Sequence, residues 1–280
     1  MDTLLLNDGH SLPKIGFGTY KCTEDEGLSS LKTALDQGYR LIDTAAYYFN
    51  EEIIGKGIRE SGVAREEIIV TTKVWREHLG YVATQKAFQE SLTKLGLDYV
   101  DVYLIHWPAN AKNFADWQRV NAETWRAMED LQAAGKIKSI GLSNFWPEHL
   151  DALLKTARVK PALNQIEFHP GYWQPDVLRY CQDHGIAVEG WSPLARGKVF
   201  QDDTIRQIAK QHEKSVAQVC LRWAVQHGVV PIPKSNTPER IAANLEIFDF
   251  ELSPEEMKAI DALPQMGFSG ELPNEWPDRQ

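Results

Sequence analysis

Seven apolar segments of this 280-residue chain each run directly into a polar side chain of a kind used in catalysis or cofactor binding. The segments are rich in Val, Ile and Leu, which is typical of strands covered on both faces and hence of a parallel sheet. In chain order they lead to Asp43, Lys73, His106, Ser143-Asn144, Gln165, Trp191-Ser192 and Lys234-Ser235. Polar residues at the carboxyl ends of successive strands are how a (β/α)₈ barrel builds an active site.

Helical patterns alternate with these strands, as expected of βα units. They cover residues 24–37, 51–61, 80–95, 116–134, 147–157, 175–184, 203–212, 215–227, 238–246 and 254–262. The turn Asn7-Asp8-Gly9-His10 predicts a hairpin of residues 3–6 and 11–14 outside the repeat. The sequence therefore predicts a single α/β domain over residues 1–280: a TIM barrel with an N-terminal β-hairpin, an extra C-terminal helix and a tail from residue 264.

Composition limits the partners of the chain. The net charge is −9, and no run rich in Lys or Arg occurs, so we expect no nucleic-acid partner. No apolar stretch approaches the ~20 residues that span a bilayer, and the N-terminus has no basic leader, so we expect neither a membrane partner nor a signal peptide. Three widely spaced cysteines favour reduced thiols in the cytoplasm, and we expect a monomer.

The segment Asp43-Thr44-Ala45-Ala46-Tyr47-Tyr48-Phe49-Asn50-Glu51 resembles the first signature of the aldo-keto reductases. In that signature a Tyr follows the Asp by five residues, so Tyr48 takes the catalytic place. Lys73 in Thr-Thr-Lys-Val-Trp and His106 in Leu-Ile-His-Trp-Pro match the remaining members of the catalytic group. The resemblance covers essentially the whole chain and is closest to short bacterial members that reduce diketo sugar acids, methylglyoxal and other small dicarbonyls.

These residue types suit the reduction of a carbonyl group. A hydride delivered to the carbonyl carbon leaves negative charge on the oxygen, which needs a hydrogen-bond donor and then a proton. The resemblance implies that Tyr48 is the general acid, Lys73 its tuner, Asp43 the anchor of Lys73, and His106 the group that orients the carbonyl. A free phenol has a pKa of about 10, and we expect the ammonium of Lys73 to lower it. Each residue alone could be structural, but the set on successive strand ends favours catalysis.

The cofactor has to be held without a Rossmann fingerprint, because the glycine pairs at Gly16 and Gly55 lack the third glycine of that motif. The resemblance implies that NADPH is bound. It places amide and hydroxyl groups on the nicotinamide carboxamide and an aromatic ring on the nicotinamide face. The residues concerned are Ser143, Asn144, Gln165 and Trp191, and the resemblance adds Gly18, Thr19, Tyr20, Asp43, Ser192 and Leu194 as further cofactor contacts.

The segment Ile232–Asn244 matches the family's motif for the adenosine phosphate. Two cations and several polar side chains would collect on a 2′-phosphate, which favours NADPH over NADH. These are Lys234, Ser235, Asn236, Thr237 and Arg240, with Asn244 on the adenine. Without the resemblance, the two cations read equally well as a solvated helix start.

An aromatic pocket is expected for the substrate, since aromatic walls exclude water. Its residues would be Tyr20, Tyr48, Trp75, His106 and Trp107, with Phe49 completing the cup. Phe114 could act as a lid, and Lys112 or Arg196 could attract a carboxylated substrate.

Two alternatives were weighed against the reductase. Glu167 and His169 offer only two metal ligands on one strand, so no metal site is predicted. An NADPH-binding sensor of the same fold is the other function considered, and the complete set of catalytic residue types favours the enzyme.

Overall fold

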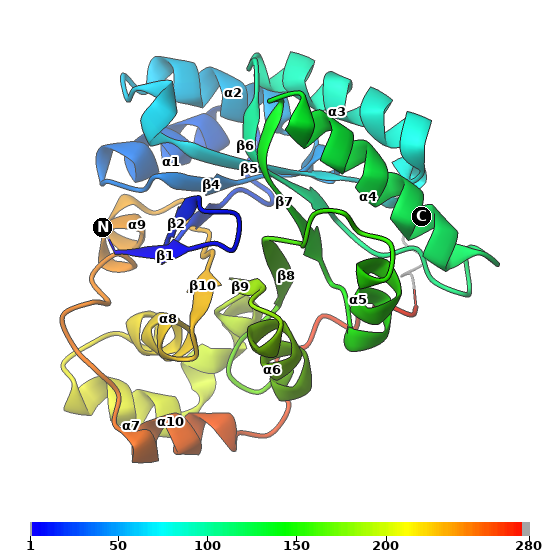
Figure 1. The fold of residues 1–280 in the computed structure, drawn as a ribbon. Coiled ribbons are helices and arrows are strands. Elements are labelled where there is room, and N and C mark those ends of the chain that lie inside the picture. The colour runs from blue at the N-terminus through cyan, green and yellow to red at the C-terminus, as the bar shows by residue number, and fades with distance from the viewer. Residues whose placement is uncertain (1, 276–280) are drawn as a thin grey trace.

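The computed structural model describes residues 2–275. Eight parallel strands form its main sheet, and each pairs with the next along the chain. They are β3 (Phe17–Gly18), β4 (Leu41–Asp43), β5 (Ile69–Val74), β6 (Val100–Ile105), β7 (Ile137–Ser143), β8 (Leu163–Glu167), β9 (Ala187–Trp191) and β10 (Val229–Pro231). The sheet closes on itself, because the amides of Gly16 and Gly18 donate to the oxygens of Pro231 and Pro233, each at 3.0 Å. The predicted barrel is confirmed (Figure 1).

The strand that the apolar segments did not predict is β3. It is two residues long and flanked or occupied by glycines, so it has no strand-like composition. A Cβ on Gly18 would lie 2.8 Å from the backbone oxygen of Ile232, and one on Gly16 would lie 2.8 Å from the side chain of Leu41. The glycines therefore permit the close approach that completes the barrel.

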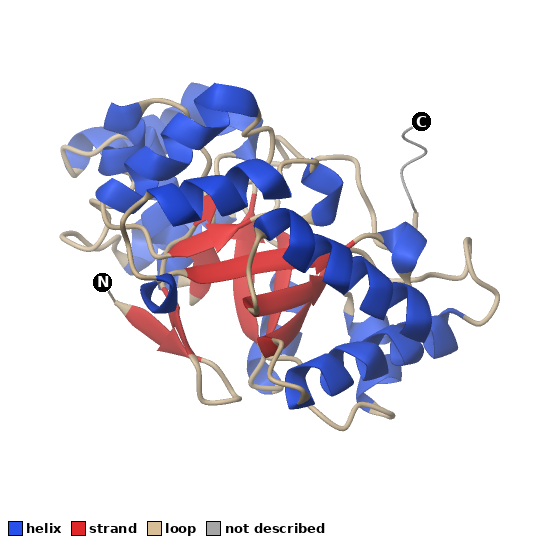
Figure 2. Ribbon diagram, turned by 90° about the horizontal axis from the view of Figure 1, so that it is seen from above, coloured by secondary structure: helices blue, strands red, loops and turns tan. Residues whose placement is uncertain are grey.

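Helices surround the strands (Figure 2), and all ten predicted helices are present. They are α1 (Glu24–Asp36), α2 (Glu51–Glu60), α3 (Tyr81–Leu95), α4 (Trp117–Ala133), α5 (Pro147–Leu154), α6 (Pro175–Asp183), α7 (Asp203–Gln211), α8 (Val216–Gln226), α9 (Pro238–Ala243) and α10 (Pro254–Asp261). Ser215 and Ser253 start α8 and α10 with capping boxes. Helices α7 and α10 exceed the eight of the repeat. None of the helices in residues 2–275 is long and apolar enough to cross a membrane.

The hairpin of β1 (Thr3–Leu5) and β2 (Ser11–Pro13) covers the amino-terminal end of the barrel. Leu6 and Leu12 pack there against interior residues of the strands, among them Leu41 and Leu163. The larger part of the core lies between the outer faces of the strands and the helices. One end of the barrel is therefore closed by apolar packing.

Strand alternation determines what fills the interior above this packing, because every second side chain on a strand points inwards. Two residues beyond Leu41 on β4 comes Asp43, and two residues beyond Leu163 on β8 comes Gln165. Both polar side chains are buried, with 2% and 1% exposure. The interior thus changes from apolar to polar towards the carboxyl ends of the strands.

Candidate active site

Three of the predicted catalytic side chains are connected by hydrogen bonds at the carboxyl ends of β4 and β5. The Nζ of Lys73 lies 2.8 Å from Asp43 Oδ1 and donates to the backbone oxygen of Thr44 at 2.9 Å and to the hydroxyl of Tyr48 at 3.2 Å. Lys73 is fully buried. The carboxylate therefore holds the ammonium, and the ammonium holds the phenol, which comes from a short 3₁₀ turn (Ala46–Tyr48) after β4.

The protonation of this group differs from the sequence-based expectation. Burial raises the pKa of Tyr48 to about 12; the charge of Lys73 lowers it by less, and Asp43 adds to the rise. The expected net lowering is therefore wrong. For Lys73, burial acts to lower the pKa, but Asp43 and Tyr48 together raise it above its ordinary value. At neutral pH the group consists of an ammonium ion and a protonated phenol, and the phenol carries the proton that a general acid must give.

His106 lies directly after β6, beside the phenol. Its ring centroid is 5.7 Å from that of Tyr48 and 5.1 Å from that of Trp75. Burial, supported by the charge of Lys73, holds the pKa of His106 well below its ordinary value, so the imidazole is neutral. Its buried Nδ1 has no hydrogen-bond partner among the described residues. A neutral ring of this kind can donate one N–H and accept one hydrogen bond.

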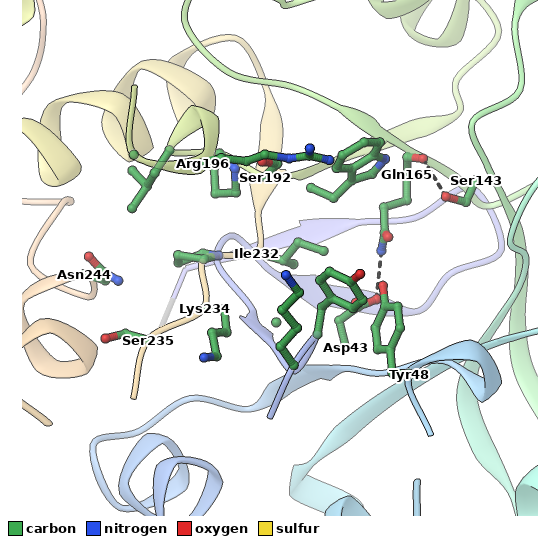
Figure 3. A pocket seen from close by; sticks show the side chains of 18 of the residues that line it. Asp43, Tyr48, Ser143, Gln165, Ser192, Arg196, Ile232, Lys234, Ser235 and Asn244 are labelled. Atoms are coloured by element: carbon green, nitrogen blue, oxygen red, sulfur yellow. Dashed lines mark hydrogen bonds between the residues drawn. The ribbon is translucent and has the colours of Figure 1, made fainter. Parts of the chain in front are cut away.

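The residues predicted for the nicotinamide form a connected group on β7, β8 and β9. Asn144 donates to the backbone oxygen of His106 at 3.0 Å, and its Oδ1 accepts from the ring nitrogen of Trp191 at 2.9 Å. The hydroxyl of Ser143 donates to the backbone oxygen of Gln165 at 2.9 Å (Figure 3). The orientations of the Asn144 amide and the Trp191 ring are therefore set by the protein itself.

A cavity of about 1080 Å³ joins these groups to the loop after β10. Its lining includes the aromatic rings of Tyr20, Trp75 and Trp107 and the cations Lys234 and Arg240. Figure 3 shows the labelled side chains along its length. The remaining predicted residues that line the cavity are Gly18, Asp43, Tyr48, His106, Ser143, Asn144, Gln165, Trp191, Ser192, Leu194, Ser235 and Asn244.

Four of the residues predicted for catalysis or for the cofactor do not line the cavity. Lys73 lies beneath Tyr48, as described above, and Thr19 is fully buried with its hydroxyl bound to the backbone oxygen of Asp43 at 2.8 Å. Asn236 accepts from the hydroxyl of Ser30 at 3.3 Å. Thr237 is the residue before α9, and its amide donates to the hydroxyl of Ser235 at 3.1 Å. The side chains of Thr19 and Asn236 and the backbone amide of Thr237 thus hold the loops that form the cavity.

Phe49 does not belong to the aromatic part of the cavity, contrary to the prediction from the sequence. That residue is 83% exposed and adopts a left-handed backbone conformation with φ 54°, so its ring does not join the cup. Tyr47 takes its place, stacked on Trp75 with ring centroids 3.8 Å apart. Phe114 and Lys112 also lie outside the cavity lining, whereas Arg196 belongs to it.

The tail after α10 reaches the cavity. Ser269 donates to both carboxylate oxygens of Glu167, through its amide at 2.9 Å and its hydroxyl at 2.7 Å. The ring of Phe268 lies on Tyr172 with centroids 4.3 Å apart, and Glu271 lines the cavity. Glu167 is thus occupied in holding the tail. The part of the predicted tail from residue 276 lies outside the described residues.

Glu271 and Glu189 are among the residues of this site that sequence reasoning missed, besides Tyr47. Glu271 comes from a segment without periodicity, which gave no signal. Glu189 is a fully buried acid on β9. It precedes Trp191 by two residues and therefore points into the barrel as Trp191 does, so alternation along the strand was a usable signal.

Comparison with known proteins agrees with this geometry. The model of the "Aldo/keto reductase family" matches residues 14–265. A glyoxal reductase of Bacillus subtilis (strain 168) is 50% identical over 275 residues, which covers 98% of this chain and 97% of that protein. A crystal structure of an aldo/keto reductase from Brucella melitensis has a TM-score of 0.87 and 48% identity, covering 93% of this chain and 98% of that one.

A Bombyx mori aldo-keto reductase in complex with NADP superposes with a TM-score of 0.86 and 39% identity, over 93% of this chain and 92% of that one. The family match includes the catalytic group and the residues that line the cavity, apart from Glu271. The chain belongs to the aldo/keto reductase family.

Proposed function

We propose that this protein is an NADP-dependent oxidoreductase that uses NADPH to reduce small aldehydes and ketones to alcohols, with Tyr48 as general acid. Dicarbonyls such as methylglyoxal and diketo sugar acids are the preferred substrates, and the 50% identity to a glyoxal reductase supports this class. One observation carries the proposal: a protonated phenol, held at 3.2 Å by a buried ammonium, opens with a neutral imidazole onto one aromatic-walled cavity.

The residues present fit NADPH. The cavity is elongated and large enough for a dinucleotide. Gln165, Ser143 and the ring of Trp191 would hold the nicotinamide at the catalytic end. At the other end, Lys234 and Arg240 would hold the adenosine phosphate, since cations are the groups that bind phosphate. When bound, NADPH supplies the hydride for the reduction.

The chain's own residues would supply the proton, orient the carbonyl group and exclude water. The Tyr48 hydroxyl gives its proton to the developing alkoxide, and Lys73 stabilises the phenolate that remains. His106, neutral because it is buried, donates an N–H that orients the carbonyl oxygen without adding a charge. Tyr47 and Trp75 form an apolar wall that excludes water from this end.

The test is to mix the protein with NADPH and either glyoxal, methylglyoxal or a diketo sugar acid, and to follow the absorbance of the reduced nicotinamide. Steady loss of absorbance with at least one dicarbonyl supports the enzyme. Tight NADPH binding without turnover across a panel of carbonyl compounds would instead identify a sensor. We further propose that the protein is a monomer and that it is cytoplasmic; the three free thiols support the second of these.

A further inference from the structure

Glu189 is an acidic side chain inside the barrel that none of the roles above requires. It is fully buried on β9, where it pairs across the ladder with Gln165 of β8. Its Oε2 accepts a hydrogen bond from Gln165 Nε2 at 2.8 Å, while Oε1 has no hydrogen-bond partner among residues 2–275. Burying a carboxyl group with one oxygen unpaired costs folding free energy, which suggests that Glu189 serves the function of the site.

The partner of Glu189 is bound by a second carboxyl group. Gln165 Nε2 also donates to Asp43 Oδ2 at 2.8 Å (Figure 3). An amide nitrogen carries two hydrogens, so both N–H groups of Gln165 are used inside the protein. Since Nε2 lies 2.8 Å from both acids, the amide oxygen, on the opposite side of the same carbon, faces neither of them. Because Gln165 lines the cavity, its oxygen is the polar atom left for a ligand.

Asp43 alone would not fix this orientation. The last torsion of a Gln side chain has a broad energy profile, so the amide can turn about it. With one acceptor only, the amide could keep one N–H on Asp43 and direct the other into the cavity. The side chain would then present a donor, or a mixture of donor and acceptor. The second acceptor removes this freedom.

We infer that Glu189 is a positioning residue that, together with Asp43, makes Gln165 present a hydrogen-bond acceptor to the cavity. The ligand group that this acceptor recognises is an amide N–H, which the carboxamide of a nicotinamide ring provides. The inference rests on the proposed function, in which that ring belongs to NADPH. A ring lacking the N–H leaves the Gln165 oxygen unpaired in a buried site.

The experiment compares equilibrium binding of NADP⁺ and of its 3-acetylpyridine analogue, which carries a methyl ketone in place of the carboxamide. Binding is followed by the quenching of tryptophan fluorescence. The wild-type protein should prefer NADP⁺ by about tenfold, the effect of one unpaired buried acceptor. In Glu189→Leu the preference should fall to about threefold or less. Circular dichroism and the melting temperature establish that the variant is folded.

Glu189→Gln is the matched control. Its side-chain oxygen can accept from Gln165 Nε2, and its nitrogen replaces an oxygen that has no hydrogen-bond partner, so the wild-type preference should be retained. If Glu189→Leu does not fold, Gln165→Leu is used instead, and it should abolish the preference for NADP⁺ over the analogue because the acceptor itself is removed.

Retention of the full preference in folded Glu189→Leu, or in Gln165→Leu, overturns the inference. So does a wild-type protein that binds both compounds equally. A wild-type protein that binds neither compound contradicts the proposed cofactor, which is a separate failure.

Discussion

At the scale of single residues, the site depends on charged groups that are buried and paired. Lys73 is enclosed by Asp43, Thr44 and Tyr48 and has no contact with solvent. A buried charge that loses its partner is strongly destabilising, so Asp43 has a structural role in addition to the one proposed for it in catalysis. The hydroxyl of Tyr48, in contrast, can be removed without leaving the ammonium of Lys73 unpaired, because Lys73 keeps its bonds to Asp43 and Thr44.

Tyr48→Phe should therefore separate chemistry from binding. Removing the hydroxyl removes the proposed general acid, so turnover should fall by about a hundredfold or more. The dissociation constant for NADPH should stay within about threefold, because the ring remains. Stopped-flow or steady-state loss of NADPH measures the first quantity and fluorescence titration the second. Tyr81→Phe is the control, because Tyr81 is a half-buried residue at the start of α3 that does not line the cavity. Normal turnover in Tyr48→Phe would remove the acid role.

Glu189 predicts a specific dependence of stability on pH. Burial raises its pKa from 4.5 to about 7, with the charge of Asp43 adding to the rise. The folded state therefore holds a proton that the unfolded chain releases, so this contribution is fully present below pH 4.5 and is lost as the pH rises through about 7. Glu189→Gln has no such proton to lose.

The free energy of unfolding of Glu189→Gln relative to wild type should consequently increase between pH 4.5 and 7, by on the order of 3 kcal/mol. Urea unfolding at a series of pH values measures the difference, and the titrations shared by both proteins cancel. A difference that does not change with pH would show that Glu189 titrates alike in the folded and unfolded chains.

At the scale of elements, short segments without regular periodicity complete the barrel and the cavity. Strand β3 closes the sheet with two residues. The loop between β10 and α9 brings Lys234 and Ser235 to the cavity, and Arg240 follows in the helix. Backbone hydrogen bonds, such as that from Gly18 to Pro233, hold these segments in place. Substitutions within them can therefore test closure of the barrel and cofactor binding separately.

Gly18→Ala should destabilise the closure of the barrel. The new Cβ would meet a backbone oxygen at 2.8 Å, which cannot move without opening the sheet, and the cost should be about 1 to 3 kcal/mol. Gly190→Ala in β9 is the comparison, because its new Cβ would lie 3.1 Å from its nearest neighbours, a looser contact than the 2.8 Å at Gly18. Urea unfolding of both variants measures which substitution lowers the free energy of unfolding more. Equal midpoints would contradict the tight contact between β3 and the β10 loop.

Arg240→Ala should weaken NADPH binding far more than NADH binding. A charge-assisted hydrogen bond to the 2′-phosphate would be lost, which corresponds to about tenfold to a hundredfold in the dissociation constant for NADPH. NADH has no such phosphate. Arg179→Ala, in the exposed Arg179–Asp176 pair of α6, is the control. Equal weakening of both cofactors would place the 2′-phosphate elsewhere.

At the scale of the whole molecule, the barrel topology brings distant residues to one mouth. Asp43 and Gln165 are 122 positions apart in the chain and share a hydrogen bond of 2.8 Å. A ligand that fills the cavity contacts several strand ends at once and so binds the closed barrel only. NADP⁺ at a hundred times its dissociation constant should stabilise the protein by about 2.7 kcal/mol, raising the melting temperature by roughly 5 °C. Differential scanning fluorimetry measures this shift, and no shift at saturation would contradict binding in the barrel.

The sequence by itself determined the barrel and the polar residues at its mouth. Periodicity and composition are local properties, so runs of Val, Ile and Leu ending at Asp43, Lys73 and His106 were sufficient to predict parallel strands with functional ends. Ten helices followed from the same kind of local pattern.

Only the tertiary structure decided what depends on contacts between distant segments. Phe49 and Tyr47 are two residues apart, yet Phe49 is exposed while Tyr47 stacks on Trp75, because the 3₁₀ turn ends at Phe49, which itself adopts the left-handed conformation. The pKa of Tyr48 rises since burial outweighs the charge of Lys73. Glu189 acquires its position from Gln165 on the neighbouring strand. Burial and hydrogen-bond pairing belong to the folded arrangement, and residue types in order along a chain do not contain them.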